Sequence, residues 1–153
     1  MMSLRYEPAT NADSGILSEI AKTSKQNWGY SNEQMDSWND DLTLTPDYIS
    51  KNHVVKIFNK GELIGFYAII TSAKTELDHL WLTPQNMRRG FGSEIFRHIK
   101  EHVSKLGKSV FHLIAEPNAK GFYEKMNGVV TGRFESKIPG RFLEIHEFTA
   151  HPH

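Results

Sequence analysis

The N-terminal part of the chain changes from an alternating to a helical spacing of its apolar residues. Residues 3–9 alternate as in a strand, and residues 10–28 place Ile16, Leu17 and Ile20 at helical spacing after several capping residues. The pattern therefore predicts that the fold opens with a strand followed by a helix.

The next segment favours two further helical pieces. A second helix is predicted to start at Ser31, because Met35, Trp38 and Leu42 recur at intervals of three and four residues. Pro46 suits the first position of one more short helical turn.

From His53 the spacing becomes that of strands and then alternates between the two types. Runs 53–59 and 63–72 flank the turn "NKGE" and predict a hairpin, and a third strand is expected at 75–82. The remaining runs predict a helix at 90–106, a strand at 109–115, a short helix at 117–128 and two closing strands at 129–135 and 141–149. The order indicates a mixed α/β (α+β) fold in a single domain, 1–153, in which strands 75–82 and 109–115 are parallel neighbours joined by a right-handed crossover.

The junction between the third strand and the long helix carries the first candidate chemistry. Gly90 and Gly92 permit a tight turn and remove the Cβ atoms that would keep a ligand away. The first amides of a helix have no partner within that helix, so they form an anion site, which Arg88 and Arg89 would reinforce. The alternative is a tight connection with two solvated arginines. The stretch contains neither a P-loop nor a complete dinucleotide-binding fingerprint, because Ile95 stands where the third glycine would be.

A second motif follows the first at a characteristic distance. "LDHLWLTPQNMRRGFGSEIFRHI" followed by "AEPNAKGFYEKMNGVV" resembles the acetyl-CoA-binding core of the GNAT N-acetyltransferase superfamily. "NWGYSNEQMDSW" and "PGR" resemble features of some bacterial members. Met87 departs from the family pattern, which has Gln or Arg at that position. The matching residues are Leu82, Pro84, Gly90, Gly92, Asn118, Phe122 and Tyr123.

The resemblance implies a fold and a set of contacts with acetyl-CoA. It implies a mostly antiparallel sheet of about seven strands with four or so helices, splayed between strands 75–82 and 109–115. Backbone amides of the glycine turn would bind the CoA pyrophosphate, and those of Leu82 and Thr83 would bind pantetheine and the acyl oxygen. Asn118 would hydrogen-bond the pantetheine arm unless it caps the short helix. The residues expected to contact CoA are Leu82, Thr83, Arg88, Arg89, Gly90, Phe91, Gly92, Ser93, Asn118, Phe122 and Lys125, the last of which could instead be a solvated surface lysine.

Acyl transfer to an amine requires a group that takes the proton of the ammonium. Such an ammonium has a pKa near ~10.4 and is charged at neutral pH. Glu76 and Asp78 lie two residues apart on a predicted strand, so both carboxylates project from one face, while His79 points to the other. Either carboxylate, or a water bound by one of them, could act as the base. Ordinary solvent-facing alternation is the competing explanation.

Tyr123 is the candidate general acid. Its unperturbed pKa of about 10 keeps it protonated at neutral pH, and a departing thiolate has a pKa near ~8.5. The alternative role is that of a core aromatic residue beside Phe122.

The acceptor is expected to be a small-molecule amine, since no docking face of one charge is evident. Trp28, Tyr30 and Trp38 either belong to the core or line an acceptor pocket, where their rings would suit a cationic amine. Arg141 would instead favour an acidic acceptor, so the charge of the acceptor stays open. The closing strands and "IPGR" could form a homodimer edge.

Composition excludes several other classes of function. The chain has 153 residues, with 18 Lys plus Arg, 18 Asp plus Glu and no cysteine, so no net charge favours nucleic acid or membranes and no thiolate site is available. The absence of cysteine and of a signal peptide favours a cytoplasmic protein. The pattern H-x-x-E-H at 98–102 is typical of zinc peptidases, but His98 and His102 border the apolar stripe of a helix, and no metal is expected. A CoA-binding sensor or interaction module without turnover is the remaining alternative, favoured by Met87.

Overall fold

The computed structural model describes residues 4–136 and 138–150, which divide into two compact units. Within the described residues, the first unit comprises 4–69 and 79–89, and the second comprises 70–78, 90–136 and 138–150. The boundary passes through strand β4 (Glu76–Leu82), whose first three residues belong to the second unit. The strand order is β1-β2-β3-β4-β5-β7-β6, which confirms the predicted mixed sheet of about seven strands. The single-domain assignment of 1–153 stays a prediction.

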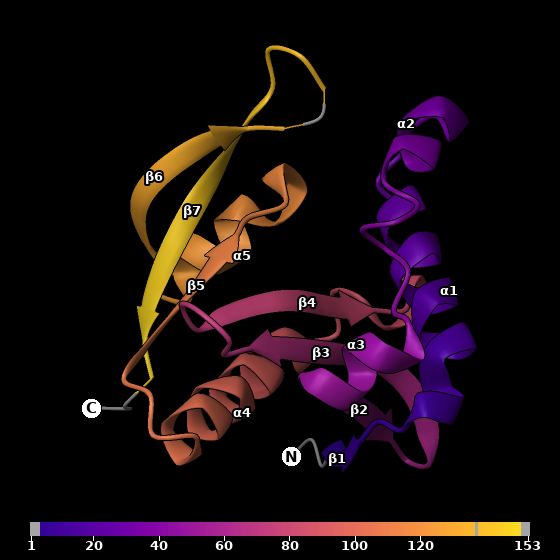
Figure 1. Ribbon diagram of the computed structural model, residues 1–153, viewed down its shortest axis with the longest axis vertical. Coiled ribbons are helices and arrows are strands. Elements are labelled where there is room, and N and C mark those ends of the chain that lie inside the picture. Colours follow the sequence, from indigo (N-terminus) through magenta and orange to yellow (C-terminus); the bar gives the residue numbers. More distant parts are fainter. Residues whose placement is uncertain (1–3, 137, 151–153) are drawn as a thin grey trace. The chain divides into compact units, whose positions relative to one another are not determined.

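The first unit contains a hairpin and a flanking N-terminal strand (Figure 1). β1 pairs antiparallel with β2, and β2 pairs antiparallel with β3 through the predicted turn at Lys60 and Gly61. Buried residues such as Ile57, Ile64 and Phe66 explain why these runs form strands: they are apolar and mostly β-branched or aromatic. The bounds are Leu4–Pro8 for β1, His53–Asn59 for β2 and Glu62–Ile70 for β3.

The helices of the first unit begin where the capping residues predict. Ser31 caps α2 by accepting a hydrogen bond from the Gln34 amide, and Thr45 caps α3 with Pro46 at the first helical turn. The second helix is shorter than predicted, because it ends at Ser37 and the chain continues in turns through Leu42. The helices are α1 (Ser14–Gln26), α2 (Asn32–Ser37) and α3 (Pro46–Lys51), with 3-10 turns at Asn11–Asp13 and Pro84–Asn86.

The second unit contains the crossover and the closing strands (Figure 1). Glu76 of β4 lies opposite His112 of β5 in a parallel pair, which confirms the predicted neighbours. The predicted splay beyond this position stays a prediction. β5 pairs antiparallel with β7, and β7 with β6. The elements are α4 (Phe91–Lys105), β5 (Val110–Ile114), a 3-10 turn (Pro117–Ala119), α5 (Lys120–Lys125), β6 (Val129–Glu135) and β7 (Phe142–Thr149).

An aromatic cluster forms the core of the second unit. The rings of Phe111 and Phe148 stack with centroids 5.3 Å apart, and Phe96 of α4 meets Phe148 edge-on at 4.8 Å. All three side chains are almost fully buried. Tyr123 of α5 also meets Phe148 edge-on, with centroids 6.3 Å apart. Because such rings bury large apolar areas in fixed geometries, the cluster positions α4 and α5 against the strands of this unit.

No helix among the residues that the structure describes has both the length and the apolar character required to cross a membrane.

Candidate functional site

The glycine turn is built as the sequence predicts. Gly90 is the N-cap of α4 and has φ = 83°, a left-handed conformation that a side chain would disfavour. No side chain caps the helix, and the amides of Gly92 and Ser93 in its first turn have no acceptor inside the helix. With fifteen residues behind it, this helix end is suited to bind an anion.

The two arginines before the turn have different surroundings. Arg88 is exposed and has φ = 60°, an unusual conformation for a residue with a side chain. Within residues 4–136 and 138–150, its guanidinium has no ion-pair or hydrogen-bond partner. Arg89 instead donates from Nη1 to Oδ1 of Asn86 at 2.8 Å, and the buried Asn86 donates to Oγ1 of Thr83 at 2.8 Å. Arg89 therefore holds the loop together, and Arg88 carries the available positive charge.

The end of β4 offers fewer free amides than predicted. The Thr83 N–H donates to the Ile64 carbonyl at 2.8 Å, so this amide is already hydrogen-bonded, and its contact with the ligand stays a prediction. The Leu82 carbonyl accepts a hydrogen bond from Ser24 at 2.8 Å. Of Leu82 and Thr83, Leu82 therefore stays the better candidate for donating a backbone amide to the ligand. Met87 is partly exposed, and its sulfur lies 3.9 Å from Nδ2 of Asn27.

The two sequence motifs meet inside the second unit. A Cβ at Gly92 would lie 2.9 Å from the ring of Phe122, so the glycine allows α4 and α5 to approach closely. Phe122 also meets Phe96 edge-on with centroids 6.0 Å apart. The glycine turn and the Phe-Tyr pair are thus in contact, although thirty positions separate Gly92 from Phe122.

Tyr123 is buried beside the aromatic cluster. Its ring lies 6.2 Å from Phe96 and 5.4 Å from Phe122, centroid to centroid. Burial, and secondarily the negative charge of Glu116, raise the pKa of the Tyr123 hydroxyl well above its ordinary value. The side chain therefore stays protonated through neutral pH. The same shift makes it a weaker acid than a free tyrosine. Both core packing and a site role are compatible with this position.

Asn118 belongs to a small polar cluster that the sequence did not indicate. It does not cap the helix: Glu116 is the N-cap of the 3-10 turn, and Nδ2 of Asn118 donates to Oε1 of Glu116 at 2.8 Å. Arg141 forms an ion pair with the same oxygen at 3.7 Å. Glu116 thus neutralises Arg141, which weakens the argument for an acidic acceptor at that residue.

The predicted carboxylate pair lies as its alternation implies. Glu76 and Asp78 are both half-buried, whereas His79 is buried on the opposite face, where its Nδ1 accepts a hydrogen bond from Trp81 at 3.0 Å. Burial raises the pKa of Glu76, Asp78 adds to the increase, and His112 opposes it. A carboxylate with a raised pKa is a stronger base, so burial makes Glu76 a suitable candidate for the base.

The early aromatic residues already surround a cation of the protein itself. Tyr30 and Trp38 form an edge-to-face pair with centroids 4.8 Å apart, and Nζ of Lys25 lies 4.1 Å from the Trp38 centroid and 5.3 Å from that of Tyr30. Trp38 is buried, and Trp28 is partly exposed. These contacts favour a structural role for Tyr30 and Trp38.

The structure gives fewer contacts for the other positions singled out in the sequence. Lys125 is exposed in the last turn of α5. Burial lowers the pKa of the half-buried His98, which lies with His102 on α4. Among the residues that the structure describes, no group of three or more His, Cys, Asp or Glu side chains could hold a metal ion.

Three polar residues near these positions were missed by sequence reasoning. His112 faces Glu76 across the parallel pair and lies 3.1 Å from Oε2 of Glu147. Glu116 accepts a hydrogen bond from Asn118 and forms an ion pair with Arg141. The ring of the fully buried His146 lies 6.2 Å from the Tyr123 ring, centroid to centroid. Of these three, only Glu116 could have been found from the local sequence, because it directly precedes "PN" and a short helix often begins after a polar capping residue.

Comparison with known proteins is consistent with this geometry. A GCN5-related N-acetyltransferase from Rhodopseudomonas palustris has a similar structure, with a TM-score of 0.78 at 20% identity over 97% of this chain and 98% of its own. The PaiA N-acetyltransferase of Thermoplasma acidophilum, solved with coenzyme A, gives 0.71 at 22% identity over 97% and 99%. A GNAT acetyltransferase from Elizabethkingia anophelis, solved with acetyl-CoA bound, gives 0.70 at 13% identity over 95% and 97%.

At the level of sequence, no curated protein gives a significant match. The family model of the acetyltransferase (GNAT) domain matches residues 18–133, a range that contains both the glycine turn and the Asn118 to Tyr123 segment. The chain belongs to the GNAT acetyltransferase family.

Proposed function

We propose that the chain is an N-acetyltransferase that moves an acetyl group from acetyl-CoA to a primary amine of a small molecule. The observation that carries the proposal is the start of α4 at Gly90, which no side chain caps. Two residues further on, Gly92 packs against Phe122, which precedes Tyr123 in the chain. This arrangement combines an anion site with a protonated hydroxyl on one unit. A cytoplasmic location fits a chain without cysteine.

The local chemistry suits the diphosphate of coenzyme A. The amides of Gly92 and Ser93 are donors without a side-chain cap, and Arg88, two residues before Gly90 in the chain, would add a positive charge. Relatives of the same fold have been solved with coenzyme A or acetyl-CoA. Acetyl-CoA would supply the activated acyl group as a thioester.

The residues of the second unit would handle the protons. Glu76, whose pKa burial raises, would take a proton from the acceptor's ammonium directly or through water, and the neutral amine would then attack the thioester carbonyl. Tyr123 would hold a proton on its hydroxyl for the departing thiolate. Because the raised pKa of Tyr123 makes that donation unfavourable in the free protein, we expect substrate binding to strengthen its acidity.

The test is a panel of amines with acetyl-CoA, scored by free thiol. The panel should contain alkyl amines, amino acids and a lysine peptide, and calorimetry should measure acetyl-CoA binding in parallel. We expect binding together with turnover of at least one small amine. Absence of binding in the wild-type protein would overturn the proposal.

The second candidate is a CoA-binding module without turnover. Met87, at a position where the family usually has Gln or Arg, is the feature that favours it. Binding of acetyl-CoA with no thiol release on any amine would support this module over the enzyme.

A further inference from the structure

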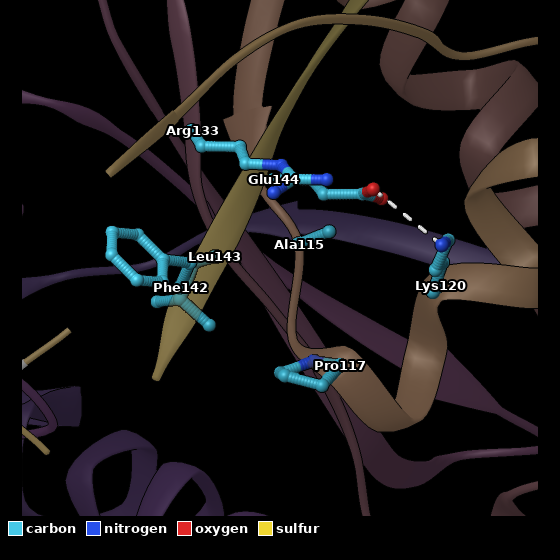
Figure 2. Close-up of a pocket in the computed structure, with 7 residues that line it drawn as sticks. All are labelled: Ala115, Pro117, Lys120, Arg133, Phe142, Leu143 and Glu144. Carbon is cyan, nitrogen blue, oxygen red and sulfur yellow. Dashed lines mark ion pairs between the residues drawn. The ribbon is translucent and has the colours of Figure 1, made fainter. Parts of the chain in front are cut away.

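A pocket of about 300 Å³ lies in the second unit, and none of its lining residues is among those proposed for acetyl transfer. It is open to solvent and combines apolar side chains with two cations and one carboxylate (Figure 2). Its volume is at the lower end of small-molecule sites, which span ~300–1,000 Å³. The lining residues are Ala115, Pro117, Lys120, Arg133, Phe142, Leu143 and Glu144.

The single carboxylate of this pocket is already engaged at both oxygens. Oε2 of Glu144 lies 3.4 Å from Nζ of Lys120, and Oε1 lies 3.3 Å from Nε2 of the fully buried His146 (Figure 2 shows the first contact). Burial alone would raise the pKa of Glu144, but the hydrogen bond from His146 and the charge of Lys120 bring it below its ordinary value. Glu144 is therefore ionised at neutral pH, and its charge is directed to these two partners.

Among the residues that the structure describes, Arg133 has no ion-pair partner. It is the cross-strand neighbour of Glu144 in the pairing of β6 with β7, the position at which an opposite charge would normally pair. Within residues 4–136 and 138–150, however, its guanidinium has no ion pair or hydrogen bond. A guanidinium presents a planar set of donors that matches a carboxylate, so its most suitable partner is an organic anion.

The other wall of the pocket is apolar and uncovered. Phe142 is 57% exposed, a large fraction for an aromatic residue, and Pro117 and Leu143 line the same pocket (Figure 2). An aromatic face of this kind binds flat apolar groups by stacking. A bare inorganic anion would leave this surface unused.

We infer that the pocket binds a small organic carboxylate with an aromatic or comparable apolar body. The carboxylate would pair with Arg133, and the body would lie against Phe142 and Pro117. The inference goes beyond the proposed acetyl transfer, because none of these three residues is among those assigned to coenzyme A or to proton transfer.

The probe is 4-fluorophenylacetate, titrated into the full chain without acetyl-CoA and followed by fluorine NMR. We expect a Kd on the order of 1 mM, consistent with the affinity of a ligand of this size. The matched amine, 4-fluorophenethylamine, and the alcohol 2-(4-fluorophenyl)ethanol should bind at least about 10-fold more weakly, because neither offers an anion to Arg133. Equal binding of all three probes, or no carboxylate binding up to about 10 mM, would overturn the inference.

Two variants and a control locate the site. Arg133→Gln should raise the Kd of 4-fluorophenylacetate about 10-fold or more, and Phe142→Ala should also weaken binding. Arg97→Gln changes another exposed arginine of the second unit, on α4, and should leave the Kd unchanged. Unfolding curves verify that each variant is folded. Undiminished binding to folded Arg133→Gln would show that the anion binds elsewhere and that this site is wrong.

Discussion

Ligand contacts were predicted from sequence both for residues 90–123 of the second unit and for residues 28–38 of the first, but the side-chain contacts found in these two segments differ. In the second unit, Gly92 packs against Phe122, and Tyr123 lies in the same cluster. In the first, Tyr30 and Trp38 pack on each other and on Lys25. The difference teaches that a motif of fixed residue types and separation predicts a spatial contact, whereas aromatic composition alone does not distinguish a pocket from a packed surface.

The largest expected effect is at Tyr123. Tyr123→Phe should lower kcat by about 10²-fold or more, because it removes the hydroxyl proton and keeps the ring in the aromatic cluster. Steady-state rates with saturating acetyl-CoA measure the change. Tyr48→Phe, at a partly exposed tyrosine of the first unit, is the matched control.

The pH profile separates an acid from a packing residue. Since burial raises the pKa of Tyr123, its deprotonation would reduce activity only above about pH 10, the ordinary range of tyrosine. An unchanged kcat in Tyr123→Phe would remove the catalytic role and leave Tyr123 as a core aromatic residue.

Glu76 is expected to give the next largest effect. The base must be deprotonated, so kcat/KM should rise with pH through a pKa above the ordinary glutamate range, because burial raises that pKa. Glu76→Gln should lower kcat/KM by about 10²-fold and abolish this acidic limb. Profiles from acidic to neutral pH provide the measurement.

Stability provides an independent readout for the same variant. A carboxyl whose pKa is raised in the folded state binds its proton more tightly there than in the unfolded chain. The contribution of Glu76 to the free energy of unfolding therefore falls as the pH rises from the pKa of the unfolded chain through the higher pKa of the folded state. The Glu76→Gln variant has no carboxyl group to lose its proton here, so its Tm at neutral pH should be no lower than that of the wild type. If Asp78→Asn abolishes the acidic limb and Glu76→Gln does not, Asp78 is the base.

The order of elements and the glycine turn could be predicted because they depend on local patterns. Gly90 follows from the need for a left-handed cap, and the strand runs follow from their apolar alternation. The engagement of the Thr83 amide by Ile64 could not be predicted, since it depends on the register of two strands. Glu116 and His146 were missed in part for the same reason: Asn118 and Glu144 lie only two residues from them, but Arg141 and the Tyr123 ring come from distant segments, and no periodicity indicates which of these groups will meet.

The arginines before the turn allow a sharper comparison within one loop. Arg88→Gln should raise the Kd of acetyl-CoA about 10-fold, the usual effect of losing one hydrogen-bonded charge, and leave Tm unchanged. Arg89→Gln should instead lower Tm, because it breaks the 2.8 Å bond to Asn86. Calorimetry and thermal unfolding of both variants test this division. An equal loss of affinity in the two variants would show that Arg89 also binds the ligand.

The smallest expected effect concerns Lys25 and tests whether the early aromatic residues bind substrate. Lys25→Met removes the cation from Trp38 and Tyr30, and an exposed contact of this type contributes about 0.5–1 kcal/mol. For a chain of this length, that loss lowers Tm by about 1–4 °C. If the rings are structural, KM for a cationic amine should change less than about 2-fold, a difference too small to reflect a lost cation–π contact. Lys22→Met, on the same helix, should alter neither quantity. A large fall in KM with an unchanged Tm would mean that Lys25 occupies the binding position of a cationic acceptor. The aromatic residues of the first unit would then form a binding site that the sequence predicts, as the glycine turn is in the second unit.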